Sequence, residues 1–206
     1  MGLSQADLAK PFVGVASTDG RVTPCNALLG EFPRPACTGV RAAGGVPFDF
    51  ASVSVADSMS MNHGGMRYSL VSRELIADGV EAVARGHAYD ALVAIAGCDK
   101  TLPGRWRGRD VTVLDTYEAV GAVLAGDMEQ RELDALERAC LPTLGSCPGQ
   151  FTANTMAMVS ETPGLALPGS ATLPAVASQR SELSRTAGQT VMRLLKEEGP
   201  LPRDLV

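Results

Sequence analysis

Short apolar runs alternate with longer amphipathic segments along the chain. Four runs have the length and apolar content of β-strands, at residues 12–16, 48–55, 91–96 and 111–114. The segments predicted as helices lie at residues 26–39, 72–85, 116–125, 127–140, 152–160 and 174–198. Because strands alternate with helices, the pattern predicts an α/β fold in which helices cover a parallel β-sheet.

Local signals refine two of these helices. Pro33 and Pro35 fall inside the segment 26–39, and because proline removes a donor and clashes with the preceding turn, they are expected to break that helix. Ser72 is predicted as the N-cap of the helix over 72–85. No linker or internal repeat divides the sequence, so residues 1–206 are predicted to form a single domain.

Composition and charge narrow the class of protein. With 45% hydrophobic and 20% charged residues, the chain has the make-up of an ordinary globular protein. Its net charge of −5 disfavours nucleic acid or an anionic membrane as the main partner, and the basic cluster at residues 105–109 is predicted to be a solvated loop. Neither an apolar stretch of about 18 residues nor a signal peptide is present, which predicts a cytoplasmic protein.

Residues whose side chains could bind a ligand or take part in a reaction lie at the ends of the predicted strands. Cys98, Asp99 and Lys100 follow the run at 91–96, Asp57 follows the run at 48–55, and Cys25 lies on the loop after the first strand. In open α/β sheets, ligands bind just outside the carboxyl ends of the strands. A thiol, carboxylates and an amine at that edge therefore predict a binding site.

The chain has five cysteines, an odd number that in a reducing compartment indicates metal ligands or inert thiols rather than a disulfide framework. Cys25, Cys98 and Cys147 lie on loops rich in Gly and Pro, and the helix that begins after Cys147 would lower the pKa of its thiol. Cys37 and Cys140 lie in helical segments, where they are predicted to be small buried side chains.

The spacing of these groups along the chain limits the kinds of metal site that they could form. No C-x2-C pair is present, and His63 and His87 are poorly placed, which excludes the common zinc modules. Iron–sulfur ligation by loop cysteines stays open, while aspartate oxygens suit magnesium. Lys100 is the exception, because a metal repels an ammonium group. It could clamp a substrate instead, or bind a metal after its amine is converted to a carbamate.

Six groups of motifs follow one another over nearly the whole chain: VTPCN (22–26), AGGVPF (43–48), SMSM (58–61) with GMRYSL (65–70), SRELIAD (72–78), GCDKT (97–101), and GSC (145–147) with FTANTM (151–156). In these motifs the sequence resembles the dihydroxy-acid dehydratase family, which includes phosphogluconate and sugar-acid dehydratases.

The resemblance implies a set of cofactors and a reaction. Cys25, Cys98 and Cys147 would bind a [2Fe–2S] cluster, and Asp57, Asp99 and a carboxylated Lys100 would bind Mg²⁺, on loops at 22–26, 57, 97–100 and 145–149. The family removes water from a 2,3-dihydroxy acid to give a 2-oxo acid, as in branched-chain amino-acid biosynthesis. A sugar acid or phosphogluconate is the alternative substrate.

The resemblance also implies that parts of the family architecture are missing. A second, β-rich domain would lie beyond Val206, carrying a further magnesium ligand and the catalytic base, and an internal deletion is expected just after Gly104. The chain would then be an incomplete dehydratase, with a non-catalytic truncated homologue or an iron–sulfur module as the alternatives. Expected partners are the dihydroxy acid and either a second copy of the chain or a full-length relative.

Overall fold

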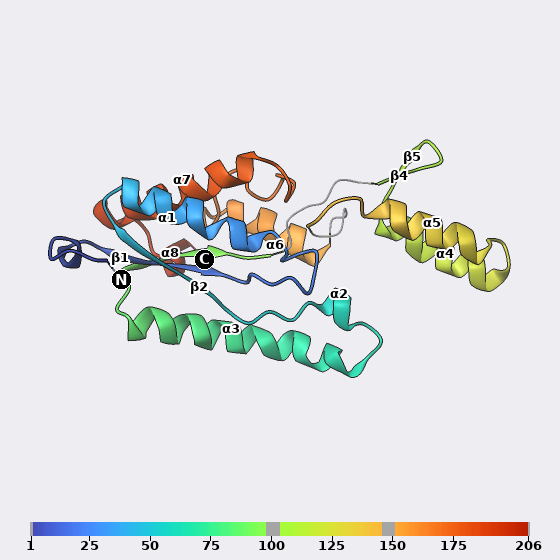
Figure 1. The fold of residues 1–206 in the computed structure, drawn as a ribbon, viewed down its shortest axis with the longest axis horizontal. Helices are drawn as coiled ribbons and strands as arrows, with labels where there is room; N and C mark the ends of the chain where they lie inside the picture. Colours follow the sequence, from blue (N-terminus) through green and yellow to red (C-terminus); the bar gives the residue numbers. More distant parts are fainter. Residues whose placement is uncertain (1, 98–103, 146–150, 206) are drawn as a thin grey trace. The chain divides into compact units, whose positions relative to one another are not determined.

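The computed structural model describes residues 2–97, 104–145 and 151–205. The chain forms two compact units (Figure 1). The first consists of Met1–Gly97 together with Ser178–Val206, and the second consists of Cys98–Ala177.

A three-stranded parallel sheet forms the centre of the first unit. Its strands are β1 (Phe12–Ser17), β2 (Val46–Ala51) and β3 (Ala91–Ile95), and they lie in the order β2-β1-β3. The central strand β1 pairs along its length with both neighbours, so that Val15 lies opposite Asp49 on one side and Val93 on the other. The predicted parallel sheet with covering helices is therefore confirmed.

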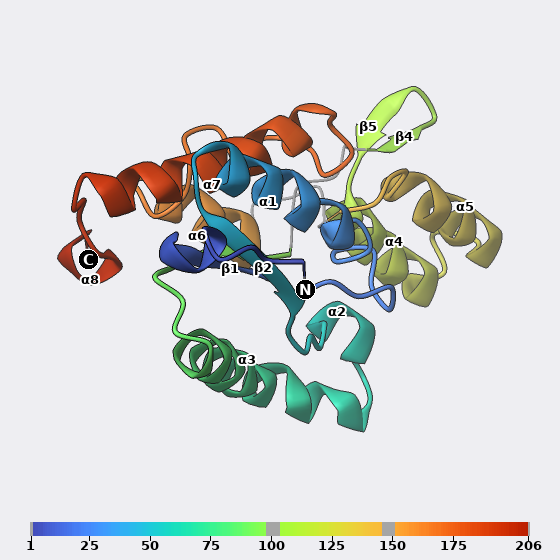
Figure 2. The same cartoon turned by 60° about the vertical axis from the view of Figure 1, so that its left-hand side comes forward.

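Helices α1 (Pro33–Ala42) and α7 (Gln179–Lys196) pack together on one side of this sheet, whereas α3 (Arg67–Gly86) lies on the other side (Figure 2). The side chains between the strands and the first two helices exclude water and stabilise the unit by burying apolar area. They are Val13, Val15, Ala36, Cys37, Val40, Val93 and Met192.

The contact between α1 and α7 is unusually close because two glycines face it. A Cβ atom added to Gly188 would overlap the carbonyl oxygen of Ala36 and would lie 2.9 Å from the backbone nitrogen of Val40. A Cβ atom added to Gly39 would overlap the carbonyl oxygen of Arg185. The two backbones therefore touch directly, and only glycine leaves room for this crossing.

The two prolines open α1 rather than break a longer helix. Residues Leu29–Glu31 form a separate 3-10 turn, and α1 begins at Pro33. Proline is well accommodated in a first helical turn, since the N–H that it lacks would have no intrahelical partner there. The prediction of a helix over 26–39 is wrong, and the helix extends to Ala42.

Other boundaries also differ from the predicted ones. Ser72 is inside α3, where its hydroxyl donates to the carbonyl of Ser69 at 2.8 Å, so it is not the N-cap. Strand β2 ends at Ala51, and the alternating residues Val53 and Val55 that follow are 55% and 39% exposed. Their alternation reflects an extended loop and not a buried strand.

In the second unit, β4 (Gly104–Trp106) and β5 (Arg109–Val111) form an antiparallel hairpin, although the sequence predicted a loop at 105–109. The two turn residues, Arg107 and Gly108, have φ values of 51° and 82°. Positive φ at both central residues is typical of the tight turn that joins antiparallel strands. The basic side chains of the hairpin pair with acids: Arg105 with Asp110, Arg107 with Glu132 and Arg109 with Asp115.

The predicted strand at 111–114 is wrong, because a helix begins within it. The hydroxyl of Thr112 accepts from the N–H of Leu114, and the Asp115 carboxylate accepts from the N–H of Thr112 at 2.7 Å. This reciprocal capping satisfies donors that would otherwise lack partners, and it starts α4 (Val113–Ala125). Helices α4 and α5 (Gln130–Cys140) pack on a core of Val111, Ala119, Leu133, Leu136 and Cys140.

The other described helices are α6 (Thr152–Glu161) and the short elements η1 (Asp7–Ala9), α2 (Asp57–Ser60), η3 (Gly64–Met66) and α8 (Pro202–Leu205). Within residues 2–97, 104–145 and 151–205, no helix is both long and apolar enough to cross a lipid bilayer.

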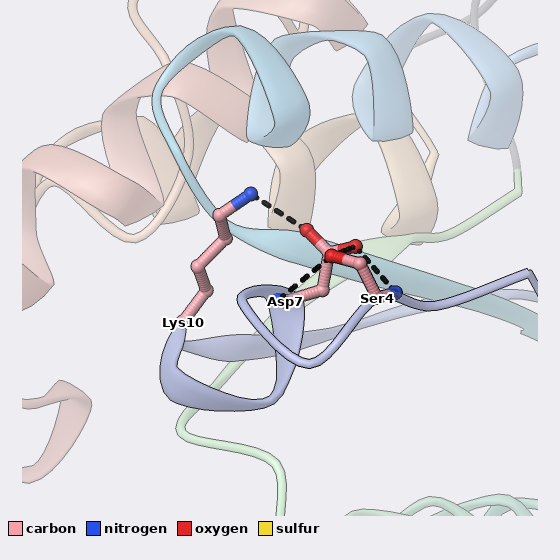
Figure 3. Close-up of polar contacts among 3 residues, drawn as sticks. All are labelled: Ser4, Asp7 and Lys10. Carbon is pink, nitrogen blue, oxygen red and sulfur yellow. Dashed lines mark hydrogen bonds and ion pairs between the residues drawn. The ribbon is translucent and has the colours of Figure 1, made fainter.

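A polar turn precedes β1 (Figure 3). Lys10 Nζ lies 2.6 Å from the Asp7 carboxylate, which also accepts from the backbone N–H and the hydroxyl of Ser4 at 2.9 and 2.7 Å. The Lys10 side chain and the Ser4 N–H hold the pKa of Asp7 well below its usual range. Asp7 is therefore ionised at neutral pH, and it fixes the turn that leads into the central strand.

We expect Gly188→Ala to lower the free energy of unfolding of the first unit by about 1–3 kcal/mol, because the added methyl group must separate α1 from α7. Gly79→Ala is the matched control. It adds the same methyl group to α3, where the new Cβ atom would lie 3.9 Å from the Ser52 hydroxyl oxygen, and it should raise stability by up to about 1 kcal/mol. Urea unfolding followed by circular dichroism measures both changes, and equal effects would contradict the close helix contact.

Candidate functional site

The three parallel strands end at one edge of the sheet, and two of the predicted site residues, Cys25 and Asp57, lie on the segments that leave this edge. Beyond the strands, the N–H of Ser52 donates to Ser17 O at 2.8 Å, and the N–H of Thr18 donates to Ile95 O at 3.4 Å. These bonds hold the segments that follow the three strands side by side where they leave the sheet. The loops after β1, β2 and β3 lead to Cys25, Asp57 and Gly97 respectively.

Cys25 lies on a loop of consecutive turns, and its side chain is half-buried. The backbone N–H of Cys25 donates to the hydroxyl of Thr23 at 3.3 Å, and the N–H of Asn26 donates to the carbonyl of Thr23 at 3.2 Å. Thr23 is itself buried, at 4% exposure. The buried Thr23 therefore fixes the backbone of the residue that carries the thiol, Cys25.

Asn26 connects this loop to the other two. Its side chain is buried, and the amide nitrogen donates to the Ser54 hydroxyl at 2.5 Å, in the segment between β2 and Asp57. Its amide oxygen lies against Gly97, so closely that a Cβ atom at position 97 would overlap it. One side chain therefore contacts the loops that follow all three strands.

Asp57 is the first residue of α2 and is exposed. One of its carboxylate oxygens accepts from the N–H of Ser58 at 2.7 Å, which orients the side chain at the start of this short helix. Because the carboxylate is accessible to solvent, a cation could reach it. The sequence placed Asp57 directly after a strand, whereas β2 ends six residues earlier, at Ala51.

The other predicted site residues, Cys98, Asp99, Lys100 and Cys147, lie outside the described residues. In the part of the chain that the structure does describe, no three His, Cys, Asp or Glu side chains come together as a metal site.

The two histidines make local contacts. His63 Nδ1 accepts from the N–H of Gly65 at 3.0 Å, which leaves the ring proton on Nε2, 3.1 Å from the carbonyl oxygen of Met59. The ring of His87 stacks on Tyr89 with 5.8 Å between centroids. His63 thus stabilises the turn before α3, and His87 lies in the turn after it.

Cys37 and Cys140 are each 3% exposed, which confirms the prediction that they are small buried side chains. Cys37 lies in the core between the sheet and α1, and Cys140 lies in the core of the second unit. Burial, with a smaller contribution from the negative charge of Asp49, raises the pKa of Cys37 to about 11. This thiol is therefore protonated at neutral pH, unlike a metal ligand, which must be a thiolate.

Asn26 and Gly97 lie within the sequence motifs, but the sequence alone predicts no role for either residue. A signal was present in the order of residues around Asn26. A polar amide directly follows Cys25 and precedes the apolar Ala27, Leu28 and Leu29, a position in which a buried amide needs partners for its hydrogen bonds. Those partners could not be identified from the sequence, because Ser54 is 28 positions away.

A family profile described as "Dihydroxy-acid/6-phosphogluconate dehydratase N-terminal" matches the chain over residues 10–109 and again over residues 105–206. The two matches meet at the β4–β5 hairpin.

Individual proteins of this kind also align with the whole chain. It is 53% identical to dihydroxy-acid dehydratase 2 of Bordetella bronchiseptica, 49% to dihydroxy-acid dehydratase 3 of Bradyrhizobium diazoefficiens and 47% to the dihydroxy-acid dehydratase of Pelagibacter ubique. Each alignment covers 100% of this chain and 39–40% of the relative, so the chain spans about 40% of the length of these curated relatives. The alignment with the Bradyrhizobium protein runs over 229 positions, 23 more than the 206 residues of this chain.

We expect alkylation of Cys37 by iodoacetamide at pH 8.5 to be at least about a hundredfold slower in the native chain than in urea, because a pKa of about 11 leaves little thiolate. The native rate should rise between pH 9 and pH 11, as the thiol begins to ionise. Peptide mass spectrometry after timed alkylation measures the rate at this cysteine. Equal rates in the native and unfolded chains would show that Cys37 is not in the core.

Proposed function

Because the chain belongs to the dihydroxy-acid/6-phosphogluconate dehydratase family, matching its amino-terminal domain, we propose that it is the amino-terminal part of a hydro-lyase. The proposed reaction removes water from a 2,3-dihydroxy acid and yields a 2-oxo acid. The observation that carries the proposal is the convergence of the Cys25, Asp57 and Gly97 loops at the carboxyl edge of a parallel sheet.

The described donors agree in type with the metals that this family uses. The half-buried thiol of Cys25 is a soft ligand suited to iron, and the exposed carboxylate of Asp57 is a hard ligand suited to Mg²⁺. We assign Cys25, Cys98 and Cys147 to a [2Fe–2S] cluster. We assign Asp57, Asp99 and a carboxylated Lys100 to Mg²⁺.

When bound, these cofactors supply Lewis acidity toward a substrate hydroxyl and positive charge for a substrate carboxylate. The protein itself holds the ligand side chains in fixed positions. Thr23 fixes the Cys25 loop from inside the fold, and the Ser58 N–H orients the Asp57 carboxylate. Groups held in place before the substrate arrives do not have to be ordered during the reaction, and this preorganisation lowers the barrier.

The extent of the chain bears on how much of the reaction it can perform. It spans about 40% of its relatives, and we propose that the catalytic base and a further magnesium ligand belong to the remaining part of the family architecture. A dihydroxy acid of branched-chain amino-acid biosynthesis is the proposed substrate, with a sugar acid or phosphogluconate as the alternative. The proposed setting is the cytoplasm, as a homodimer or in association with a full-length relative.

We also propose that residues 1–206 correspond to one amino-terminal domain from which a segment after Gly104 has been deleted. Two profile matches that meet at residues 105–109, and an alignment longer than the chain, support this proposal.

The test is anaerobic purification of the chain, followed by iron and sulfide analysis, a visible spectrum and an assay for 2-oxo acid from 2,3-dihydroxyisovalerate. We expect iron and sulfide in the wild-type chain, and loss of most of both in Cys25→Ser, since a cluster held by three cysteines loses a ligand. Cys140→Ala is the matched control, because Cys140 lies in an apolar core and its replacement should keep the cluster.

Each result assigns the chain to a different class. Cluster with product would identify a dehydratase that is active by itself. Cluster without product would identify a metal-binding part of a dehydratase, or a non-catalytic homologue. A folded wild-type chain without iron would contradict the cluster assignment.

A further inference from the structure

We propose that helix α3 is a dimer surface, on which the α3 helices of two copies of the chain pack side by side in antiparallel orientation. The inference deepens the homodimer named under the proposed function, because it gives that dimer a surface and a register. It uses only residues of α3, Arg67–Gly86, and it does not depend on the assignment of cofactors.

One face of α3 attaches the helix to the rest of the first unit. Ser72 is buried there, and the half-buried residues at helical spacing on the same face are Ile76, Val80 and Val83. In Figures 1 and 2, no other described element of the first unit lies along the far side of α3. Much of the surface of this helix is therefore accessible to a partner.

The accessible surface carries a line of large apolar side chains. Tyr68, Val71 and Leu75 are 64%, 55% and 57% exposed. Their spacing of three and four residues places them within about one sixth of the helix circumference, about a quarter of a turn from the face that contains Ser72. We call these three side chains the α3 seam. Single exposed apolar residues are ordinary, whereas a contiguous group marks an interaction surface.

The charges beside the α3 seam favour a second copy of the chain as the partner. Arg67 and Asp78 are eleven positions apart, which is about three turns, so both flank the same side of the seam. Both are exposed, and neither has an ion-pair partner among the described residues. In an antiparallel pair, the cation of each copy meets the anion of the other, while a parallel pair would align like charges.

The apolar contacts and the ion pairs require the same register. With the two-fold axis between Val71 and Leu75, each Val71 packs on Leu75 of the second copy. Arg67 then lies level with position 79 of the second copy, only one residue, or about 1.5 Å along the axis, from Asp78. Because both copies use the same surface, the contact closes as a dimer and does not extend into a filament.

The experiment measures the dissociation constant of the full chain by analytical ultracentrifugation, over concentrations from about 2 to 200 μM. A seam on one helix is smaller than the roughly 800 Å² that each partner buries in a standard stable complex, so we expect a micromolar dissociation constant. We expect Leu75→Arg to raise it at least about tenfold, because the change places a guanidinium group in the apolar seam of each copy.

Leu70→Arg is the matched control. It makes the same change on the same helix, at a residue that is 70% exposed and lies more than about a third of a turn from Leu75. It should leave the dissociation constant unchanged. Circular dichroism of each variant checks that the chain is folded.

Charge reversal tests the register without changing the α3 seam. Arg67→Asp and Asp78→Arg should each raise the dissociation constant about fivefold at low ionic strength, because either change places two pairs of like charges across the dimer. The double variant exchanges the two charges and should return the constant close to the wild-type value. Since both positions are exposed, these variants keep the test decisive even if Leu75→Arg does not fold.

A wild-type chain that stays monomeric at 200 μM would overturn the dimer surface, and so would equal dissociation constants for Leu75→Arg and Leu70→Arg. Failure of the double charge variant to recover would overturn the antiparallel register. Iron and sulfide analysis of the same preparations separates this inference from the proposed function. A dimer without iron contradicts the cluster assignment and leaves the α3 surface standing, whereas a monomer with iron does the reverse.

Discussion

The direct backbone contact between α1 and α7 is the constraint on which the first unit depends. Gly39 and Gly188 let the two helices approach so closely that a Cβ atom at either position would overlap the backbone of the other helix. At this separation, Met192 from α7 and Val40 from α1 reach the same core as the strands. A wider spacing would leave voids under both helices, and voids of this kind destabilise a close-packed interior.

The sheet transmits this constraint to the candidate site. With α1 and α7 fixed on one face, β1 is held between β2 and β3, and the loops at the carboxyl edge start from defined positions. Asn26 then joins those loops beyond the last strand pairs. The precision of the site thus comes from the buried sheet and helices, while the loops supply the chemical groups.

The sequence predicted the features that depend on local pattern. Strands β1 and β3 were recognised from their apolar runs, and the position of Cys25 and Asp57 beyond strand ends followed from the α/β alternation. Errors arose where one pattern has two physical meanings. Val53 and Val55 alternate like strand residues yet are exposed, and a β-branched run at Val111 and Val113 was divided by the cap at Thr112.

The contacts that assemble the site were beyond local pattern. Asn26 meets Ser54 and Gly97 only because β1, β2 and β3 lie side by side, and the sequence carries no direct record of that pairing. The glycines of α1 and α7 were missed for the same reason, since their partner backbones come from opposite ends of the chain. For Cys98, Asp99, Lys100 and Cys147, the assignment to cofactors rests on motif and family.

The distance along the chain between α1 and α7 also sets the order in which the protein can form during synthesis. Lys196 of α7 donates to the carbonyl oxygen of Ala43, 153 positions earlier. The hairpin, α4 and α5 make their contacts within a short stretch of chain and can form soon after they leave the ribosome. Helix α1 covers only part of the apolar face of the sheet, so the part under α7 stays exposed until α7 is released, and exposed apolar surface of this kind attracts chaperones.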